Sequence, residues 1–80
     1  MKARVQIFYK ESVFDPQGNT VAENLRRLGF SRVIGVRIGK TIDLELDTDS
    51  QNQTKEDIRK MCEKLLANPV IEQYQIELLE

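Results

Sequence analysis

Residues 34–46 read I-G-V-R-I-G-K-T-I-D-L-E-L, two runs of alternating apolar and polar residues on either side of a glycine and a lysine. Alternation with a period of two is typical of half-buried strands, so the pattern predicts a β-hairpin within residues 31–47. A two-residue turn would send the two apolar sets to opposite faces of the hairpin. A three-residue loop, Gly39–Thr41, places Val36 opposite Leu44 on one face, and we expect this loop.

Two more strands are predicted near the ends of the sequence. Residues 2–9 alternate, with Ala3, Val5, Ile7 and Tyr9 on one side. Residues 73–78 also alternate, with Tyr74, Ile76 and Leu78 on one side. Each pattern is that of a strand with one face on a core.

The first predicted helix follows Asp15-Pro16. Aspartate is a good N-cap, and proline is well suited to the first helical position because its missing N–H is not needed there. Thr20 with Glu23 offers a competing, later capping box. Gly29 is the expected C-terminal stop. The helix carries one apolar stripe, formed by Val21, Leu25 and Leu28.

The second predicted helix has the clearest periodicity in the sequence. Its capping signature is Thr54 with Asp57, and Asn68-Pro69 is expected to end it because the residue before proline avoids the α region. Apolar side chains follow the spacing i, i+3, i+4, i+7, i+8, at Ile58, Met61, Cys62, Leu65 and Leu66.

The predicted order is β-α-β-β-α-β, the ferredoxin-like arrangement, in one α+β domain over residues 1–80. Two helices are expected to cover one face of a four-stranded antiparallel sheet. The other face is left open, either as a solvated surface or as an interface. We favour an interface at this open face. Its predicted residues are Arg4, Gln6, Phe8, Val33, Arg37, Asp43, Glu45, Gln73, Gln75 and Glu77.

Length and composition exclude several classes of protein. A domain of 80 residues has a thin core, which disulfides, a metal or oligomerisation often support. One cysteine and no histidine exclude a disulfide framework and the usual zinc ligand set, so oligomerisation is expected. A formal net charge of -1 argues against nucleic-acid binding. We also expect no membrane span, no signal peptide and a cytoplasmic location.

No residue pattern predicts catalysis by this chain. Cys62 has no histidine to act as its base and lies on the apolar stripe, so a buried core cysteine is expected. The acidic residues after Ile42 alternate along a strand and lack a calcium-loop pattern. The glycines do not have a phosphate-binding spacing. Arg37 and Lys40 could contact an anion or a carboxylate of a partner, or could be ordinary exposed charges.

The ferredoxin-like arrangement hosts many activities, and three classes can be compared. An acylphosphatase-type enzyme needs an arginine in the loop after the first strand, and residues 10–15 contain none. An RNA-recognition module needs paired aromatic residues on its central strands, where only Phe8 qualifies. A protein-interaction subunit needs neither feature.

Three segments of the sequence resemble the PurS family, the small accessory subunit of phosphoribosylformylglycinamidine synthase. They are V-F-D-P-Q-G at residues 13–18, V-R-I-G-K at residues 36–40 and M-C-E-K-L-L-A-N-P-V-I-E at residues 61–72. The resemblance extends from the first predicted strand to Tyr74.

The resemblance implies a non-catalytic subunit in de novo purine biosynthesis. It implies a homodimer or homotetramer that bridges a PurL-type synthetase subunit and a PurQ-type glutaminase subunit for ammonia transfer. It also implies that this chain binds no cofactor, since ATP and Mg are used by the synthetase subunit. A small-molecule-binding regulatory module of the same fold is the alternative. The candidate partner contacts are Asp15, Pro16, Gly18, Arg37, Gly39, Lys40, Asn68 and Pro69.

Overall fold

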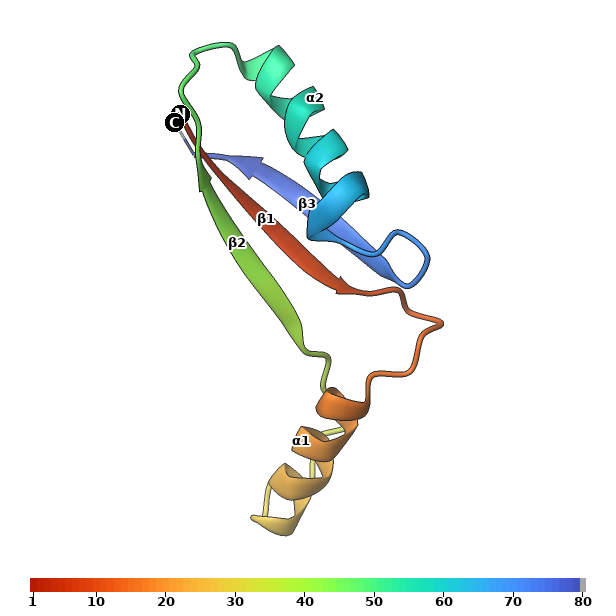
Figure 1. The fold of residues 1–80 in the computed structure, drawn as a ribbon. Coiled ribbons are helices and arrows are strands. Elements are labelled where there is room, and N and C mark those ends of the chain that lie inside the picture. Colours follow the sequence, from red (N-terminus) through yellow and green to blue (C-terminus); the bar gives the residue numbers. More distant parts are fainter. Residues whose placement is uncertain (80) are drawn as a thin grey trace.

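The computed structural model of the chain describes residues 1–79, which form an elongated α+β molecule (Figure 1). Its elements are β1 (Lys2–Tyr9), α1 (Pro16–Arg27), β2 (Gly39–Glu45), α2 (Gln51–Met61), a π-helical turn η1 (Cys62–Leu66) and β3 (Glu72–Leu78). The molecule measures 49 × 25 × 14 Å, with a radius of gyration of 16.0 Å. A compact domain of this length has a radius of gyration of about 12 Å. The elements therefore do not all pack around one core.

The sheet has three antiparallel strands in the order β2-β1-β3. Ala3 lies opposite both Leu44 and Leu78, and Val5 lies opposite Ile42 on one side. Directly opposed residues share a face, so the apolar positions of all three strands gather on one side. The first and last predicted strands are confirmed.

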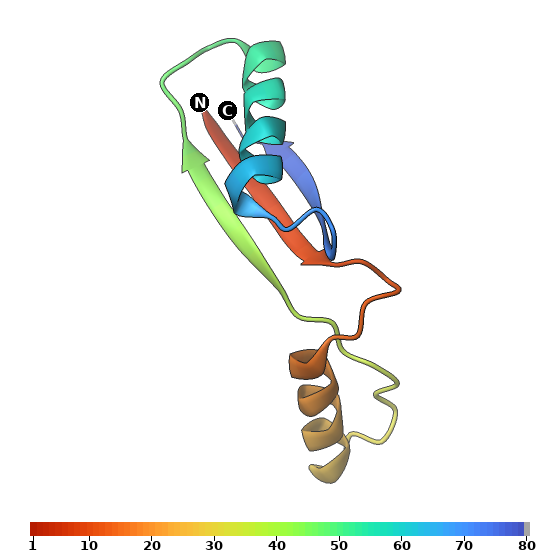
Figure 2. The ribbon, with the colours of Figure 1, turned by 45° about the vertical axis from the view of Figure 1, so that its right-hand side comes forward.

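The core lies between this apolar face and α2, which crosses the sheet (Figure 2). The helix buries Ile58 and, at its end, Cys62. Its contacts among the strands are chiefly with β3. The buried core cluster is Ala3, Val5, Ile7, Ile58, Cys62 and Ala67.

The predicted hairpin, and with it the fourth strand, is wrong. Gly39 begins β2 opposite Phe8 instead of forming a turn, and Leu44 pairs with Ala3 instead of Val36. Residues 33–38 are extended but belong to no sheet among the described residues.

Hydrogen bonds to α1 and its cap explain why no hairpin forms. The backbone N–H of Ile38 donates to the Asp15 carboxylate at 2.7 Å. The Arg26 guanidinium donates to the carbonyl oxygens of Val33 and Ile34, each at 2.9 Å. These contacts hold backbone groups of the extended segment against α1, so the segment follows the helix instead of folding back on β2.

Helix α1 lies beyond the end of the sheet and covers neither face, so the expectation of two helices on one face is also wrong (Figures 1 and 2). Its N-cap is Asp15, as predicted, whose carboxylate accepts from the Gly18 N–H at 2.9 Å. The later capping box at Thr20 is not used. Gly29 has φ 105°, the left-handed conformation of a helix stop, as predicted.

We call residues 15–38 the arm, since they form α1 and the extended segment that runs back beside it. The predicted apolar stripe of α1 is largely uncovered: Val21 and Leu28 are exposed and Leu25 is only half-buried. The stripe has no sheet to cover because α1 packs on its own extended segment alone.

Helix α2 begins earlier and ends differently than the periodicity predicts. Its N-cap is Ser50, and Thr54 is instead buried, donating its hydroxyl to the Ser50 carbonyl at 2.5 Å. The π-helical turn η1 has a wider winding than an α-helix, which rotates the last part of the predicted stripe. Leu65 is therefore exposed. The helix does end before Asn68, as expected.

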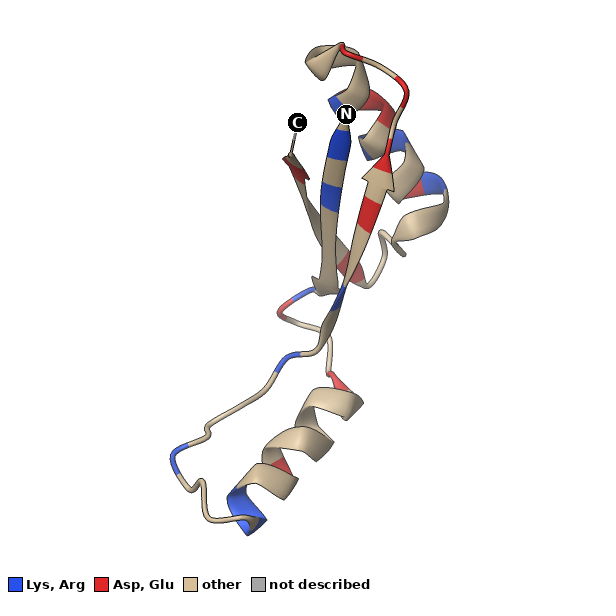
Figure 3. Ribbon diagram, turned by 90° about the vertical axis from the view of Figure 1, so that its left-hand side faces the viewer, with Lys and Arg blue, Asp and Glu red and all other residues tan. Residues whose placement is uncertain are grey.

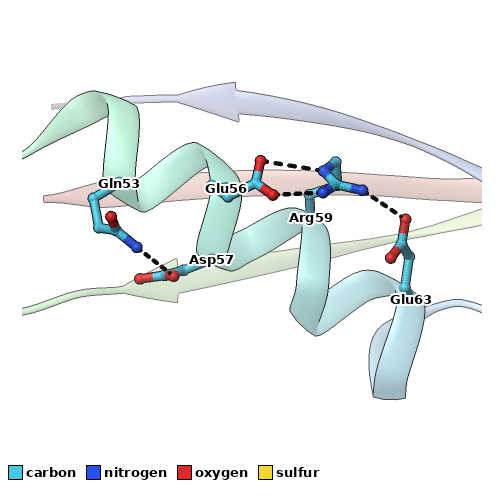
Figure 4. Close-up of polar contacts among 5 residues, drawn as sticks. All are labelled: Gln53, Glu56, Asp57, Arg59 and Glu63. Carbon is cyan, nitrogen blue, oxygen red and sulfur yellow. Dashed lines mark hydrogen bonds and ion pairs between the residues drawn. The ribbon is translucent and has the colours of Figure 1, made fainter.

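The outer face of α2 and η1 carries two separate groups of polar contacts (Figure 4). Arg59 donates to Glu56 at 2.5 Å and to Glu63 at 2.9 Å, and Gln53 donates to Asp57 at 2.9 Å. The hydrogen bond from Arg59 lowers the pKa of the Glu56 carboxyl. Such exposed contacts add little stability, and they identify this face as the solvated side of the helix.

Candidate protein-interaction site

Six of the eight candidate contact residues meet where the arm joins the sheet. The N-cap of α1 and the first residues of β2 lie side by side there, tied by the hydrogen bond between Asp15 and Ile38. The six are Asp15, Pro16, Gly18, Arg37, Gly39 and Lys40. The other two, Asn68 and Pro69, lie in the exposed loop between η1 and β3.

Asp15 is a buried residue that joins α1 to the extended segment of the arm. One carboxylate oxygen accepts from the Ile38 N–H at 2.7 Å and the other from the Gly18 N–H at 2.9 Å. These two hydrogen bonds lower the pKa of the Asp15 carboxyl, and the bond from Ile38 has the larger effect. Both carboxylate oxygens of Asp15 therefore accept hydrogen bonds that hold the junction together.

Arg37 performs a similar task for the loop between β1 and α1. Its guanidinium donates to the carbonyl oxygens of Val13 at 3.0 Å, Lys10 at 2.7 Å and Tyr9 at 3.4 Å. The residue is nevertheless exposed. Contact of Arg37 with a partner carboxylate stays a prediction, and its internal hydrogen bonds give it a structural role in addition.

Two glycines permit close approach of the backbone at the junction. A Cβ added at Gly39 would lie 2.6 Å from the carbonyl oxygen of Ile7. A Cβ added at Gly18 would overlap the carbonyl oxygen of Val36. Gly39 therefore serves strand pairing instead of the turn that the sequence predicts, and Gly18 lets α1 lie against the extended segment.

A shallow hollow of about 420 Å³ lies beside the junction, at the end of the sheet. Its lining includes Phe8, Glu11, Arg37, Lys40 and Gln73. The lining mixes both charges with two aromatic residues, Phe8 and Tyr9, which suits a protein side chain better than one defined anion. Among residues 1–79, no group of three or more His, Cys, Asp or Glu side chains is placed to hold a metal ion.

The loop that contains Asn68 and Pro69 is held by its own hydrogen bonds. The Asn68 N–H donates to the Glu72 carboxylate at 2.7 Å, and the Asn68 side chain accepts from the Val70 N–H at 3.1 Å. Val70 is exposed at the tip. The loop thus presents a fixed shape at the surface, and its contact with a partner stays a prediction.

The open face of the sheet is polar, as expected. Arg4 on β1 donates to Asp43 on β2 at 2.8 Å, and this hydrogen bond lowers the pKa of the Asp43 carboxyl. Figure 3 shows basic residues on β1 beside acidic residues on β2. Val33 and Arg37, which we expected on this face, belong to the arm instead.

Exposed apolar side chains of the arm were not identified as surface residues by the sequence. Leu28, Phe30 and Ile34 are all exposed. Their pattern is the same as that of core residues, so only the position of the arm, outside the sheet, separates them. The hydrogen bonds from Arg26 to the carbonyl oxygens of Val33 and Ile34 had no signal in the sequence either.

Cys62 is a buried free cysteine, as predicted. Burial raises the pKa of its thiol, which keeps it protonated and unreactive. No described helix is long and apolar enough to cross a membrane.

These features define a small α+β protein with part of a ferredoxin-like arrangement, an open polar sheet face and an apolar arm outside its core. The family model for PurS, described as phosphoribosylformylglycinamidine (FGAM) synthase, matches residues 2–80. The chain belongs to the PurS family.

Curated relatives and solved structures agree with this assignment. The chain is 42% identical over 76 residues to phosphoribosylformylglycinamidine synthase subunit PurS of Methanocaldococcus jannaschii, covering 95% of this chain and 92% of that protein. The structure of Bacillus subtilis PurS has a TM-score of 0.89 at 43% identity, over 99% of this chain and 98% of that one. A chain of the PurLQS structure from Thermotoga maritima has a TM-score of 0.87 at 36% identity, over 98% and 95% of the two chains.

Proposed function

We propose that this chain is the non-catalytic subunit of FGAM synthase that bridges a glutaminase subunit and an ATP-dependent synthetase subunit. Membership of the PurS family supports the subunit role. The likeness to a chain of the PurLQS structure supports partners of the PurL and PurQ types. The structural observation that carries the bridging role is the exposed apolar surface of the arm, because such surface outside a core marks interaction sites.

The chemistry of the reaction explains why a bridging subunit is useful. The glutaminase releases ammonia from glutamine, and the synthetase uses ATP and Mg to activate the amide oxygen of formylglycinamide ribonucleotide. Ammonia then replaces that oxygen to give the amidine. Ammonia that escapes into water is protonated and lost, so the two sites must be held together while the transfer occurs.

In this proposal the chain contributes contacts and no chemical step. ATP and Mg bind to the synthetase subunit, and the present chain binds no cofactor. The contacts come from the exposed apolar surface of the arm, from the junction of arm and sheet and from the loop at Asn68. The complex works in the cytoplasm, where the other purine-synthesis substrates are expected.

The chain also works as a homodimer or homotetramer. Its radius of gyration of 16.0 Å, well above the roughly 12 Å of a compact domain, reflects an arm that no other part of the described chain covers. A thin core of this kind is commonly completed by association.

Reconstitution of the enzyme tests the bridging role. Purified glutaminase and synthetase subunits are assayed for amidine formation with glutamine or with ammonium chloride, each with and without this chain. The proposal predicts that the glutamine-dependent rate requires the chain and that the ammonia-dependent rate does not. A full glutamine-dependent rate without the chain would refute bridging. Heat stabilisation of the chain alone by a nucleotide or amino acid would then favour the regulatory alternative.

A further inference from the structure

We infer that the free edge of β3 is where an extended, basic segment of a partner subunit adds to the sheet as a further strand. In strand addition, backbone hydrogen bonds give the affinity and alternate side chains give the specificity. The inference rests on the proposed function and deepens it, since it names the surface and the kind of segment through which this chain holds one of its partners.

β3 is an edge strand whose backbone direction is fixed at both ends. It pairs with β1 on one side only (Figure 1). Before the strand, the Lys10 N–H donates to the Ile71 carbonyl oxygen at 2.9 Å. After it, the Leu79 N–H donates to the Lys2 carbonyl oxygen at 2.7 Å. The backbone groups of residues 71 and 79 therefore point toward β1.

The outward-pointing backbone groups of β3 follow from these two hydrogen bonds. In an antiparallel pair, residues that exchange hydrogen bonds with the neighbouring strand alternate with residues whose backbone groups point away from it. The odd-numbered residues of β3 therefore bond to β1. The N–H and C=O groups of Tyr74, Ile76 and Leu78 point outward, and no strand within residues 1–79 lies on that side to pair with them.

The β3 edge lacks the features that normally keep an edge strand from pairing. Natural edge strands are commonly very short, bulged, or protected by lysine or proline. β3 is 7 residues long, stays in continuous register with β1 from Glu72 to Leu78, and contains neither lysine nor proline. Its regular backbone is a template for a further strand.

The apolar side chains of β3 are incompletely covered. Tyr74, Ile76 and Leu78 pack against the core yet are only half-buried. On the central strand, by contrast, Ala3 and Val5 are fully buried. A further strand with alternating apolar residues would cover the part of the β3 side chains that the present sheet leaves in water.

The charges along β3 itself are negative. Glu72 and Glu77 lie near its two ends, and the strand has no basic residue. Arg4 on the open face is close enough to Glu77 to interact with it, but its guanidinium is paired with Asp43 at 2.8 Å. This side of the edge therefore keeps a negative charge.

On the helix side of β3, two carboxylates share one arginine (Figure 4). Arg59 donates to Glu56 at 2.5 Å and to Glu63 at 2.9 Å. These charges lie close to the strand, because the pKa of the Tyr74 hydroxyl is raised first by burial and then by the negative charge of Glu63. Negative charge on both sides favours an incoming segment with lysine or arginine. It disfavours the β3 strand of a second copy, which is equally acidic.

Amide hydrogen exchange tests strand addition residue by residue. The chain is exchanged alone and with the purified glutaminase subunit, the synthetase subunit, or both, in the presence of ATP, Mg and glutamine, and is then read by NMR after quenching. We expect one of the two subunits to slow exchange of the Tyr74, Ile76 and Leu78 N–H groups at least about 10-fold, because each gains a backbone hydrogen bond. The N–H groups of Gln75 and Glu77, already bonded to β1, are the internal reference.

Three results would overturn the inference. The first is a complex in which these three N–H groups exchange as fast as in the free chain. The second is protection spread evenly over exposed residues without alternation along β3, which is the signature of a partner that lies on a face. The third is full protection in the chain alone, because a second copy would then occupy the edge.

A proline variant tests the same edge through affinity. The Ile76 N–H points away from β1, so Ile76→Pro removes no hydrogen bond of the present sheet. Ile76→Ala is the matched control, since it loses the same side-chain packing and keeps the N–H. We expect the proline variant to bind the protecting subunit at least about 10-fold more weakly than the alanine variant, measured by titration calorimetry. Equal affinities would overturn strand addition, and the exchange measurement decides the question for a proline chain that does not fold.

A charge reversal tests the basic character of the incoming segment. Glu77→Lys places a cation beside the edge and should weaken binding of the same subunit about 10-fold. Glu23→Lys, an equal charge change at an exposed position of α1, is the control and should weaken it less than about 2-fold. Equal effects of the two variants would overturn the inference.

Strand addition and bridging fail in different ways. A chain that restores glutamine-dependent activity while the β3 edge stays unprotected would refute strand addition alone. A chain whose β3 edge is protected by one subunit, but which does not restore that activity, would refute bridging alone. A chain that binds neither subunit would overturn both.

Discussion

Replacing Gly18 by alanine changes the free energy of unfolding, and the sign of the change shows whether helix propensity or steric overlap has the larger effect. Gly18 is in the first turn of α1, where alanine is favoured over glycine by about 0.5–1 kcal/mol. Its added Cβ, however, would overlap the Val36 carbonyl oxygen and lie 2.9 Å from the Asp15 carboxylate. Overpacking of this kind costs about 1–3 kcal/mol. The difference is a net loss of about 1 kcal/mol in the free energy of unfolding.

The assay is urea unfolding of Gly18→Ala beside the wild type at one protein concentration, with amide hydrogen exchange to locate the effect. Exchange from α1 should accelerate more than exchange from β1, because the overlap lies between α1 and the extended segment. Gly35→Ala is the matched control, since no atom lies within 4 Å of its added Cβ. A Gly18→Ala chain as stable as the wild type, or more stable, would refute the packing of α1 on the extended segment.

Four further predictions follow from the core and the junction. Ile58→Ala removes a fully buried side chain and should lower the free energy of unfolding by about 2–5 kcal/mol, whereas Val70→Ala at the exposed loop should change it by less than about 0.5 kcal/mol, both measured in urea. Arg37→Lys should speed proteolysis of the loop at residues 10–15 as much as Arg37→Ala does, because one ammonium cannot reach three carbonyl oxygens. A lysine variant cleaved as slowly as the wild type would contradict the role of the Arg37 hydrogen bonds in holding this loop. The pKa of the Asp15 carboxyl is lower in the folded chain than in the unfolded chain. The ionised carboxylate therefore stabilises the fold fully above the unfolded pKa of about 3.9, and this stabilisation is lost as the pH falls through the lower folded pKa. Asp15→Asn should remove this acid dependence of the free energy of unfolding, measured in urea between about pH 5 and pH 2. The Cys62 thiol should react with a disulfide reagent only as fast as the chain opens, and reaction at the rate of the denatured chain would show that it is not buried.

The local elements were predictable because their signals are local. Asp15-Pro16 defines the start of α1, Gly29 defines its end, and alternation defines β1 and β3. Thr54 was misjudged as a cap because its hydroxyl, buried one turn inside the helix, bonds the Ser50 carbonyl instead of a free N–H. Capping motifs compete within one turn, and tertiary burial decides between them.

The hairpin was mispredicted for a different reason. Alternation around Gly39 specifies two extended runs and the face of each side chain, but it does not specify whether the chain turns between them. Here the Asp15 carboxylate holds the Ile38 N–H, and Gly39 permits β1 to approach closely. Both contacts join residues far apart in the sequence, so no local pattern could indicate them.

The candidate contact residues are a mixed case. Six of the eight gather at one junction, which the spacing of the sequence could not have shown. Asp15 and Arg37 are engaged with backbone groups of their own chain, and Lys40 lines the neighbouring hollow. The exposed apolar residues of the arm, such as Ile34, were missed because the sequence predicted them as core.

The measurement that tests the central claim most directly is sedimentation of the glutaminase and synthetase subunits, each carrying a different dye, with ATP, Mg and glutamine present. The account predicts that the two dyes move as one species when this chain is added and as two species when it is left out. If the two subunits move together without this chain, or stay apart in its presence, the chain is not the bridge between them.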